Sequence, residues 1–196
     1  MQIKSVLRKE LLAARKLVSE EKRMELSFKT AEALFSTDEF KRADSVFCYI
    51  NKKEEVYTRG IVSYAILCGK KVAAPMCRGG EMIFKYINDE NDLEKGVFSV
   101  YEPKSYCTGA EVSPDTVCIT PALCYNRQGY RIGYGKGYYD RFFEKNACVK
   151  IGLCFEENII DFNPSEGDKA VDIIVTDKGV YRIKKPDTIR INENSE

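Results

Sequence analysis

The sequence predicts a single α/β domain in which helices flank a largely parallel central sheet. Short apolar segments alternate along the chain with amphipathic helical patterns, which favours parallel strands joined through helices. The length of 196 residues is enough for one domain with its own core, and the sequence contains no internal repeat. We assign residues 1–186 to this domain and residues 187–196 to a polar C-terminal tail.

The amino-terminal part of the chain predicts three helices. Residues 3–17 mix leucine and valine with lysine and arginine in an amphipathic helical pattern. Ser19 is a suitable N-cap for a second helix that runs to about residue 35. Ser36 followed by Glu39 matches the capping-box pattern, and it predicts a short third helix.

Apolar strands and two further helices follow. Pro75 is expected to end the second strand. Residues 88–115 are polar and rich in turn-forming residues, so we expect a long loop with one short strand, and long loops are often functional. The predicted strands are residues 45–50, 70–76, 82–87, 116–125, 149–155, 171–176 and 179–183, and the predicted helices are residues 56–68 and 138–144.

The composition argues against several classes of protein. The formal net charge is +1, so no bulk field attracts nucleic acid or a membrane surface. No apolar segment approaches the roughly 20 residues that cross a bilayer. The charged amino terminus lacks the apolar centre of a signal peptide. We therefore expect a cytoplasmic protein, monomeric or weakly homo-oligomeric, that binds neither nucleic acid nor membranes.

Cysteine and histidine usage limits the chemistry. The eight cysteines form no Cys-x-x-Cys pair and the chain has no histidine, which argues against a zinc site and favours buried thiols in a reducing compartment. Without histidine there is no Ser-His-Asp or Cys-His nucleophile pair. A reaction driven by positioning and charge stabilisation fits this chain better.

The most informative motif is "GYRIGYGKGYYDRFF" at residues 129–143, in which three glycines alternate with other residues. Glycine allows sharp turns and lets backbone N–H groups approach a ligand closely. N–H groups that lead into a helix form an anion site, and Lys136 and Arg131 add positive charge to it. The pattern predicts a phosphate site, with a structural glycine-rich turn as the alternative. The glycines are Gly133, Gly135 and Gly137.

The spacing of this motif excludes two well-known phosphate loops. A Walker A loop requires serine or threonine after its lysine, but Gly137 follows Lys136. The third glycine comes too early for the dinucleotide-binding fingerprint. Asp140, close behind the glycines, is suited to hold the metal ion that accompanies a polyphosphate.

The motif resembles the signature of the 5-formyltetrahydrofolate cyclo-ligase family, whose members are also called methenyltetrahydrofolate synthetases. The resemblance covers nearly the whole chain and implies a Rossmann-like fold of the NagB/RpiA/CoA transferase type. Asn158, where glutamine is frequent, and the basic "NKKE" before Glu55 depart from the family pattern. The other matching segments are "KSVLR" (4–8), "EEVYT" (54–58), "KKVAAPM" (70–76), "GVFSVYEP" (96–103), "IGLCFEEN" (151–158) and "DKAVDIIVTD" (168–177).

This resemblance implies an ATP-dependent ligase that forms a C–N bond. ATP and 5-formyltetrahydrofolate would give 5,10-methenyltetrahydrofolate, ADP and phosphate, with Mg²⁺ as the cofactor. The sequence does not decide whether the folate carries a polyglutamate tail. Two alternatives stay open: a phosphotransferase or sugar-phosphate isomerase that uses the same glycine loop, and a non-catalytic folate- or nucleotide-binding module.

The resemblance also implies a role for individual residues. From the residues alone, Lys4 and Arg8 would be a solvated helix face; for Glu55 the alternative is an ordinary exposed acid, and for Asp172 it is a strand-end turn residue. By resemblance, Lys136 and Arg131 are catalytic; ATP contacts Lys4, Arg8, Arg131, Ile132, Gly133, Tyr134, Gly135, Lys136, Gly137, Tyr138 and Tyr139; the folate contacts Ile50, Glu55 and Tyr138; and Mg²⁺ is held by Asp140 and Asp172.

Overall fold

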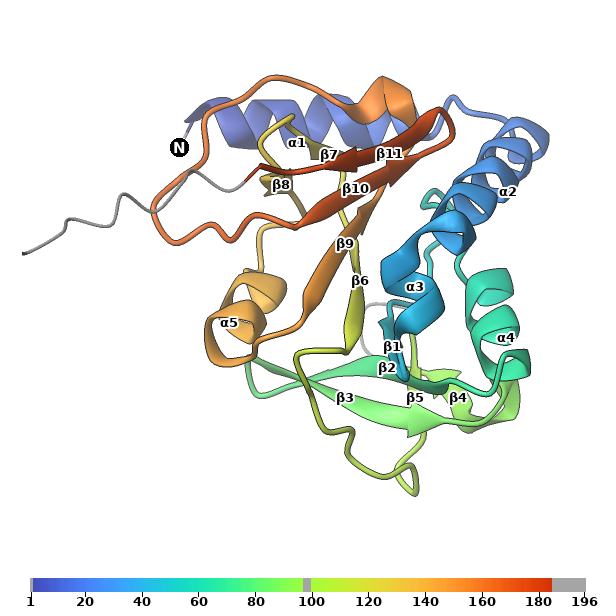
Figure 1. Ribbon diagram of the computed structural model, residues 1–196. Helices are drawn as coiled ribbons and strands as arrows, with labels where there is room; N and C mark the ends of the chain where they lie inside the picture. The colour runs from blue at the N-terminus through green and yellow to red at the C-terminus, as the bar shows by residue number, and fades with distance from the viewer. Residues whose placement is uncertain (1, 97–99, 185–196) are drawn as a thin grey trace, which may run out of the picture.

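A seven-stranded sheet forms the centre of the molecule (Figure 1). The computed structural model describes residues 2–96 and 100–184, so the predicted tail at 187–196 lies outside the described residues. The strand order is β11-β10-β9-β6-β1-β2-β3, with antiparallel pairing only for β2–β3 and β10–β11. The predicted largely parallel α/β fold is therefore confirmed. The strands are β1 Ser45–Cys48, β2 Lys71–Arg78, β3 Glu81–Ile87, β6 Val117–Pro121, β9 Val149–Leu153, β10 Ile173–Thr176 and β11 Gly179–Arg182.

Helices cover both faces of this sheet. In Figure 1, α2, α3 and α4 lie on one face and α5 lies on the other. Helix α1 runs along the end of the sheet near the short strands β7 (Cys124–Tyr125) and β8 (Arg131–Ile132). Short 3₁₀ turns lie at Glu90–Asp92 and Glu156–Asn158. The helices are α1 Gln2–Arg15, α2 Glu20–Ser36, α3 Asp38–Arg42, α4 Arg59–Leu67 and α5 Tyr138–Lys145.

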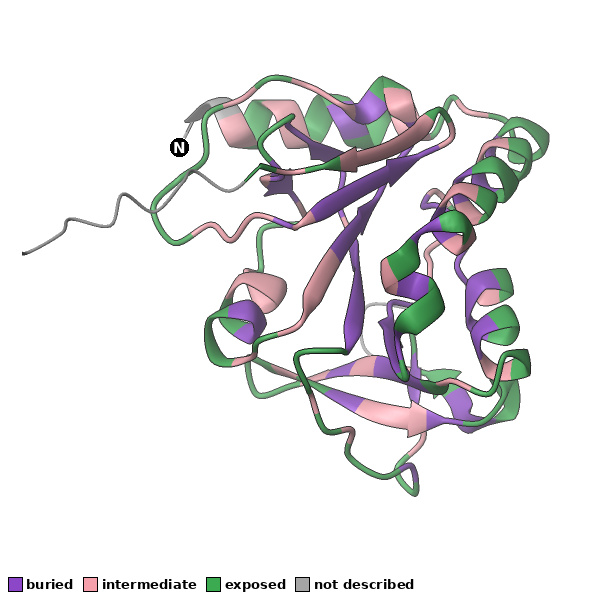
Figure 2. Cartoon of the chain, viewed as in Figure 1, coloured by how far each residue is buried: buried purple, intermediate pink, exposed green. Residues whose placement is uncertain are grey.

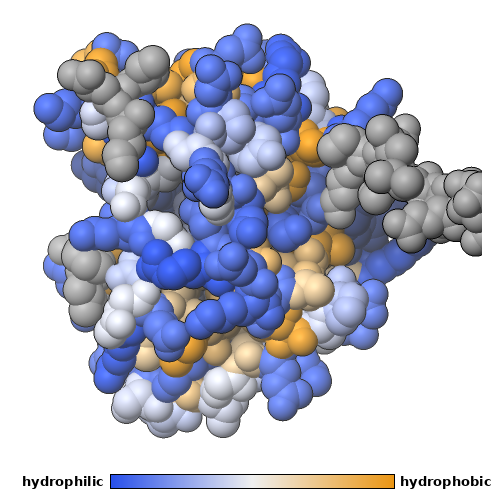
Figure 3. Space-filling view, turned by 90° about the vertical axis from the view of Figure 1, so that its left-hand side faces the viewer, coloured by the Kyte–Doolittle hydropathy of each residue, from blue (hydrophilic) through white to orange (hydrophobic). Residues whose placement is uncertain are grey.

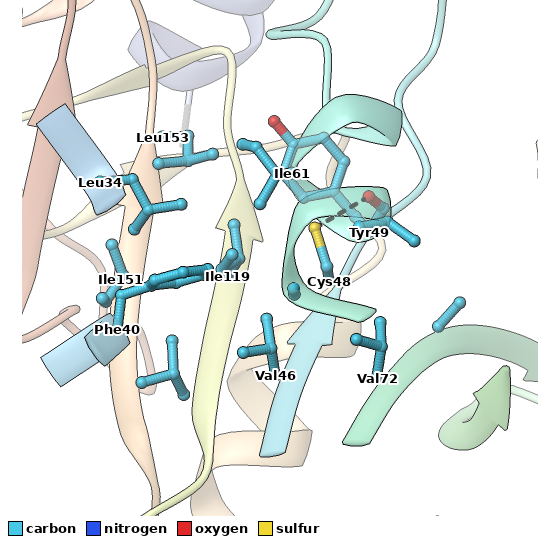
Figure 4. Close-up of a cluster of buried hydrophobic side chains, with 14 of the residues drawn as sticks. Leu34, Phe40, Val46, Cys48, Tyr49, Ile61, Val72, Ile119, Ile151 and Leu153 are labelled. Atoms are coloured by element: carbon cyan, nitrogen blue, oxygen red, sulfur yellow. Dashed lines mark hydrogen bonds between the residues drawn. The ribbon is translucent and has the colours of Figure 1, made fainter. Parts of the chain in front are cut away.

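The central strands supply apolar residues to both faces because successive side chains of a strand point in opposite directions. Figure 2 shows these strands buried, while the outer sides of the helices are exposed. On one face, Val46 and Ile119 pack with Leu34 of α2 and Phe40 of α3 (Figure 4). On the other face, Phe47 belongs to a smaller cluster with the phenylalanines of α5. This second cluster fixes the helix that follows the glycine motif.

Several predicted element boundaries differ from the structure by two or three residues, as at the start of α4, and two further errors have a clear physical cause. The third helix is capped by Thr37, whose hydroxyl accepts a hydrogen bond from the Phe40 amide, because Ser36 still belongs to α2. Pro75 does not end β2, which continues to Arg78. The β1 pairing stops at Ala73, so the missing N–H of Pro75 interrupts no bond to β1, while β3 pairs with the rest of β2.

Two other segments are divided into more short strands than predicted. The strand expected at 116–125 divides, because the chain leaves the sheet at Pro121. It then forms the two-stranded pair β7 Cys124–Tyr125 and β8 Arg131–Ile132, which leads into the glycine motif. The polar segment at 88–115 contains two short strands that pair with each other, β4 Leu93–Lys95 and β5 Tyr101–Pro103.

The surface is predominantly polar. On the face shown in Figure 3, hydrophilic residues dominate and hydrophobic residues occur in small separate groups. Across the two described ranges, every helix is too short or too polar to span a bilayer.

Candidate functional site

A cavity of about 490 Å³ opens at the carboxyl ends of β1 and β6. Tyr49 and Ile50, which directly follow β1, lie in its wall together with Pro121 at the end of β6. β1 has β2 on one side and β6 on the other, so the chain order reverses here. Ligands of open α/β sheets bind at such a reversal, beyond the carboxyl ends of the strands.

The glycine motif forms another part of the cavity wall. Gly133, Gly135 and Gly137 all line it, as does Lys136. Gly135 has a φ of 88° and Gly137 a φ of 65°, a left-handed conformation that side chains rarely adopt. Gly137 immediately precedes α5, so the motif turns sharply into the positive end of a helix dipole.

Arg131 connects the motif to the segment before β10. Its Nη2 donates to Asp140 Oδ1 at 2.8 Å and its Nη1 donates to the Lys169 carbonyl at 2.8 Å. The Lys169 amide also donates to Asp140 Oδ1, at 3.1 Å. The Arg131 side chain is only 6% exposed, so it lies in the wall as a buried support with two of its nitrogens engaged by the protein.

Helix α1 places two cations in the same wall, one helical turn apart. Lys4 Nζ lies 2.5 Å from Asp168 Oδ2, and Arg8 Nε donates to the Gly133 carbonyl at 2.9 Å. Leu11 of α1 packs in a buried cluster with Ile132 of β8, which holds the helix against the motif. Ile132 itself, predicted to contact ATP, is 1% exposed and is absent from the cavity wall.

Glu55 lies on the loop that follows β1. The residue is 5% exposed and lines the cavity. Its Oε1 accepts a hydrogen bond from the Tyr134 hydroxyl at 3.0 Å, and its Oε2 accepts one from the Lys52 amide at 2.8 Å. A carboxylate accepts several hydrogen bonds, so this buried acid retains capacity for donors from a ligand.

Two tyrosines at the start of α5 also line the cavity. Tyr138 is near the guanidinium of Arg141, which lies 5.2 Å from its ring centroid. The Tyr139 hydroxyl is buried and has no hydrogen-bond partner among the described residues. Burial raises the pKa of Tyr139 well above its usual value, so its hydroxyl stays protonated.

The structure does not bring the two predicted metal ligands together. Asp140 lines the cavity, but Asp172 does not. Asp172 directly precedes β10, and its Oδ2 accepts from the Lys150 amide at 2.9 Å and lies 3.7 Å from Lys150 Nζ. These are the amino ends of β9 and β10, the edge opposite the carboxyl ends where the cavity opens.

Sequence reasoning missed Asp168, which lies in the cavity wall. Asp168 lies four residues before Asp172 in the same segment, and only the course of the loop before β10 places the first carboxylate and not the second in the wall. Lys52 was also missed as a wall residue, although the basic stretch before Glu55 was an available signal.

The chain is similar to known proteins over nearly its full length. The model of the 5-formyltetrahydrofolate cyclo-ligase family matches residues 1–177. A probable 5-formyltetrahydrofolate cyclo-ligase of Caenorhabditis elegans is 26% identical, covering 89% of this chain and 92% of the relative. One of Schizosaccharomyces pombe is 28% identical, covering 74% and 80%.

Solved structures show the same fold. The NMR structure of the 5,10-methenyltetrahydrofolate synthetase of Aquifex aeolicus superposes with a TM-score of 0.82 and 30% identity, covering 99% of this chain and 100% of the other. A 5,10-methenyltetrahydrofolate synthetase from Mycoplasma pneumoniae has a TM-score of 0.71 at 23% identity, with coverages of 89% and 98%, and this match concerns the fold alone.

Proposed function

Because the chain belongs to the 5-formyltetrahydrofolate cyclo-ligase family, we propose that it converts 5-formyltetrahydrofolate and ATP into 5,10-methenyltetrahydrofolate, ADP and phosphate. One observation carries the proposal beyond family membership. A single cavity is lined both by the glycine motif with its cations and by the buried carboxylate of Glu55. Phosphates and a folate ring therefore have complementary groups within one site.

The chemistry needs little from protein nucleophiles. The formyl oxygen attacks the γ-phosphorus, a new O–P bond forms, and the bond to the β-phosphate oxygen breaks to release ADP. N10 of the folate then attacks the activated carbon and loses its proton, and phosphate departs with the former formyl oxygen. The substrate supplies both nucleophiles, which suits a chain without histidine. The protein aligns the two substrates and stabilises the charge on the transferring phosphoryl group.

The wall residues divide between these two tasks. Lys136 and the N–H groups of the motif would attract the phosphates, with Lys4 and Arg8 adding charge from α1. Glu55 would accept hydrogen bonds from the amino-pyrimidine edge of the folate, with Ile50 and Tyr138 beside the ring. Arg131 would act chiefly by holding Asp140 and the motif in place.

Asp140 and Asp168 fit a magnesium site better than Asp140 and Asp172. Both line the cavity, and the Lys169 amide that follows Asp168 donates to Asp140. The hydrogen bonds described for Asp140 go to Oδ1 and those for Asp168 go to Oδ2, so each carboxylate has a second oxygen for a cation. The described residues contain no cluster of three or more metal-ligating side chains, but Mg²⁺ commonly uses one or two carboxylates together with substrate phosphates. When bound, the ion would neutralise phosphate charge.

The metal assignment predicts how single variants respond to Mg²⁺. Asp140→Asn and Asp168→Asn should each raise the Mg²⁺ concentration for half-maximal activity by at least about ten-fold. Replacing a residue that only hydrogen-bonds to a metal ligand already lowers metal affinity by about ten-fold or more, and these two carboxylates would bind the ion directly. Asp172→Asn is the control, and it should leave the Mg²⁺ midpoint unchanged. The measurement is a Mg²⁺ titration at fixed ATP. If the Mg²⁺ midpoint shifted in Asp172→Asn but not in Asp168→Asn, the metal ligands would be Asp140 and Asp172, as the family resemblance implies.

The activity itself is tested with the purified chain, ATP and Mg²⁺, using 5-formyltetrahydrofolate with and without a polyglutamate tail. We expect a near-ultraviolet absorbance from the methenyl product and one ADP per product. ADP release without folate would favour another phosphotransferase, and binding without turnover would favour a non-catalytic module.

We expect this reaction in the cytoplasm, since all eight cysteines are unpaired thiols.

A further inference from the structure

Tyr134 connects the glycine motif to Glu55, on the loop after β1, through its side chain. It lies within the glycine motif, between Gly133 and Gly135, and all three residues line the cavity. Its hydroxyl donates to Oε1 of Glu55 at 3.0 Å, across 79 positions of sequence. The motif that faces the nucleotide is thereby connected directly to the carboxylate that faces the folate.

The backbone around Tyr134 is held from the other side by α1. Arg8 Nε donates to the Gly133 carbonyl at 2.9 Å. A Cβ built on Gly135 would lie 3.4 Å from Arg8 Cζ, so the guanidinium packs closely against both neighbours of Tyr134. The backbone on both sides of Tyr134 therefore contacts one arginine, and a movement of this backbone would also move the Tyr134 phenol that it carries.

The acceptor end of this connection is equally well defined. Glu55 is buried, and its second oxygen accepts from the Lys52 amide at 2.8 Å. The Lys52 ammonium lies 4.0 Å from the centroid of the Tyr134 ring, a favourable cation–π geometry. Burial and the neighbouring Glu55 carboxylate raise the pKa of Tyr134, so the phenol stays protonated and donates. The Tyr134 side chain, which remains 40% exposed, therefore has two partners on the loop after β1.

We propose that Tyr134 is a positioning residue that couples nucleotide binding to folate binding by orienting the Glu55 carboxylate from within the glycine motif. This inference rests on the proposed function, since it assigns the nucleotide to the glycine motif and the folate to Glu55. A nucleotide that orders the motif would fix the Tyr134 hydroxyl and with it Glu55. Coupling between two binding sites is reciprocal, so folate would strengthen nucleotide binding by the same factor.

The test compares Tyr134→Phe with the wild type by calorimetry. The affinity for 5-formyltetrahydrofolate is measured with and without a non-hydrolysable ATP analogue and Mg²⁺. In the wild type we expect the analogue to tighten folate binding at least about five-fold, the lower end of typical couplings. In Tyr134→Phe this ratio should fall to about one, and folate alone should bind about ten-fold more weakly, equivalent to about 1.4 kcal/mol. A general loss of stability would not abolish the ratio.

Two further variants make the result specific. Tyr64→Phe is the control, because Tyr64 lies exposed on α4 outside the cavity wall, and it should keep the wild-type ratio. Glu55→Gln combined with Tyr134→Phe should weaken folate binding by less than the product of the single effects. A wild-type ratio in Tyr134→Phe, or a ratio of one in the wild type, overturns the inference while leaving the activity assay unaffected. A wild type that neither binds nor converts the folate overturns the proposed function and this inference with it.

Discussion

Replacing Lys136 by alanine is expected to lower kcat/KM for ATP by about 10²–10³-fold, the loss seen when one preorganised charge-stabilising group is removed. Lys136 lines the cavity between two glycines whose backbone is left-handed, with φ of 88° and 65°. The conformation of these two glycines fixes the position of the Lys136 Cα atom, from which the side chain extends. Negative charge spreads over the transferring phosphoryl group in the transition state, so an aligned ammonium stabilises that state more than the ground state.

Steady-state kinetics with ATP and folate varied in turn will separate this effect from a general defect. Lys145→Ala is the matched control, because Lys145 ends α5 with a 70% exposed side chain that pairs with Glu81 at 3.3 Å. We expect it to retain wild-type kinetics. If Lys136→Ala also kept its kcat/KM for ATP, Lys136 would have no part in phosphoryl transfer, and the motif would serve through its backbone alone.

The parts of the fold and site that could be predicted depend on local signals. The buried strands have runs of apolar residues, and the glycine motif brings its cations, glycines and Asp140 together within one short segment. The residues of such a segment can be predicted to line a site, because the glycines that form the turn and the residues that begin the helix are adjacent in the sequence. Lys4 and Arg8 needed the family resemblance, since a basic helix turn alone describes an ordinary solvated surface.

The parts that could not be predicted depend on contacts between distant segments. Asp168 and Asp172 are chemically identical carboxylates, and only the course of the loop before β10 puts the first in the wall. The continuation of β2 past Pro75 depends on β3 as its partner. The bond from Tyr134 to Glu55 likewise arises from packing the motif against the loop after β1. Sequence periodicity contains no information on these pairings.

Replacing Phe47 by alanine should reduce the free energy of unfolding by about 3–5 kcal/mol, a large share of a typical total of about 5–15 kcal/mol. Phe47 is fully buried in the middle of β1. Its ring centroid lies 4.7 Å from that of Phe84, which in turn lies 5.0 Å from that of Phe142 in α5. The alanine would leave a cavity in the cluster that supports α5, and close packing prevents the neighbours from filling it completely.

Urea unfolding measures this effect as a lower midpoint at an unchanged slope. Phe28→Ala is the control, since Phe28 is 66% exposed on α2 and its loss should change stability by no more than about 0.5 kcal/mol. Because α5 carries Asp140 and begins at the glycine motif, Phe47→Ala should also weaken ATP use at temperatures where the protein remains folded. Equal stabilities of the Phe47 and Phe28 variants would mean that α5 is held by contacts other than this aromatic cluster, and the motif would then owe its position to Arg131 and α1.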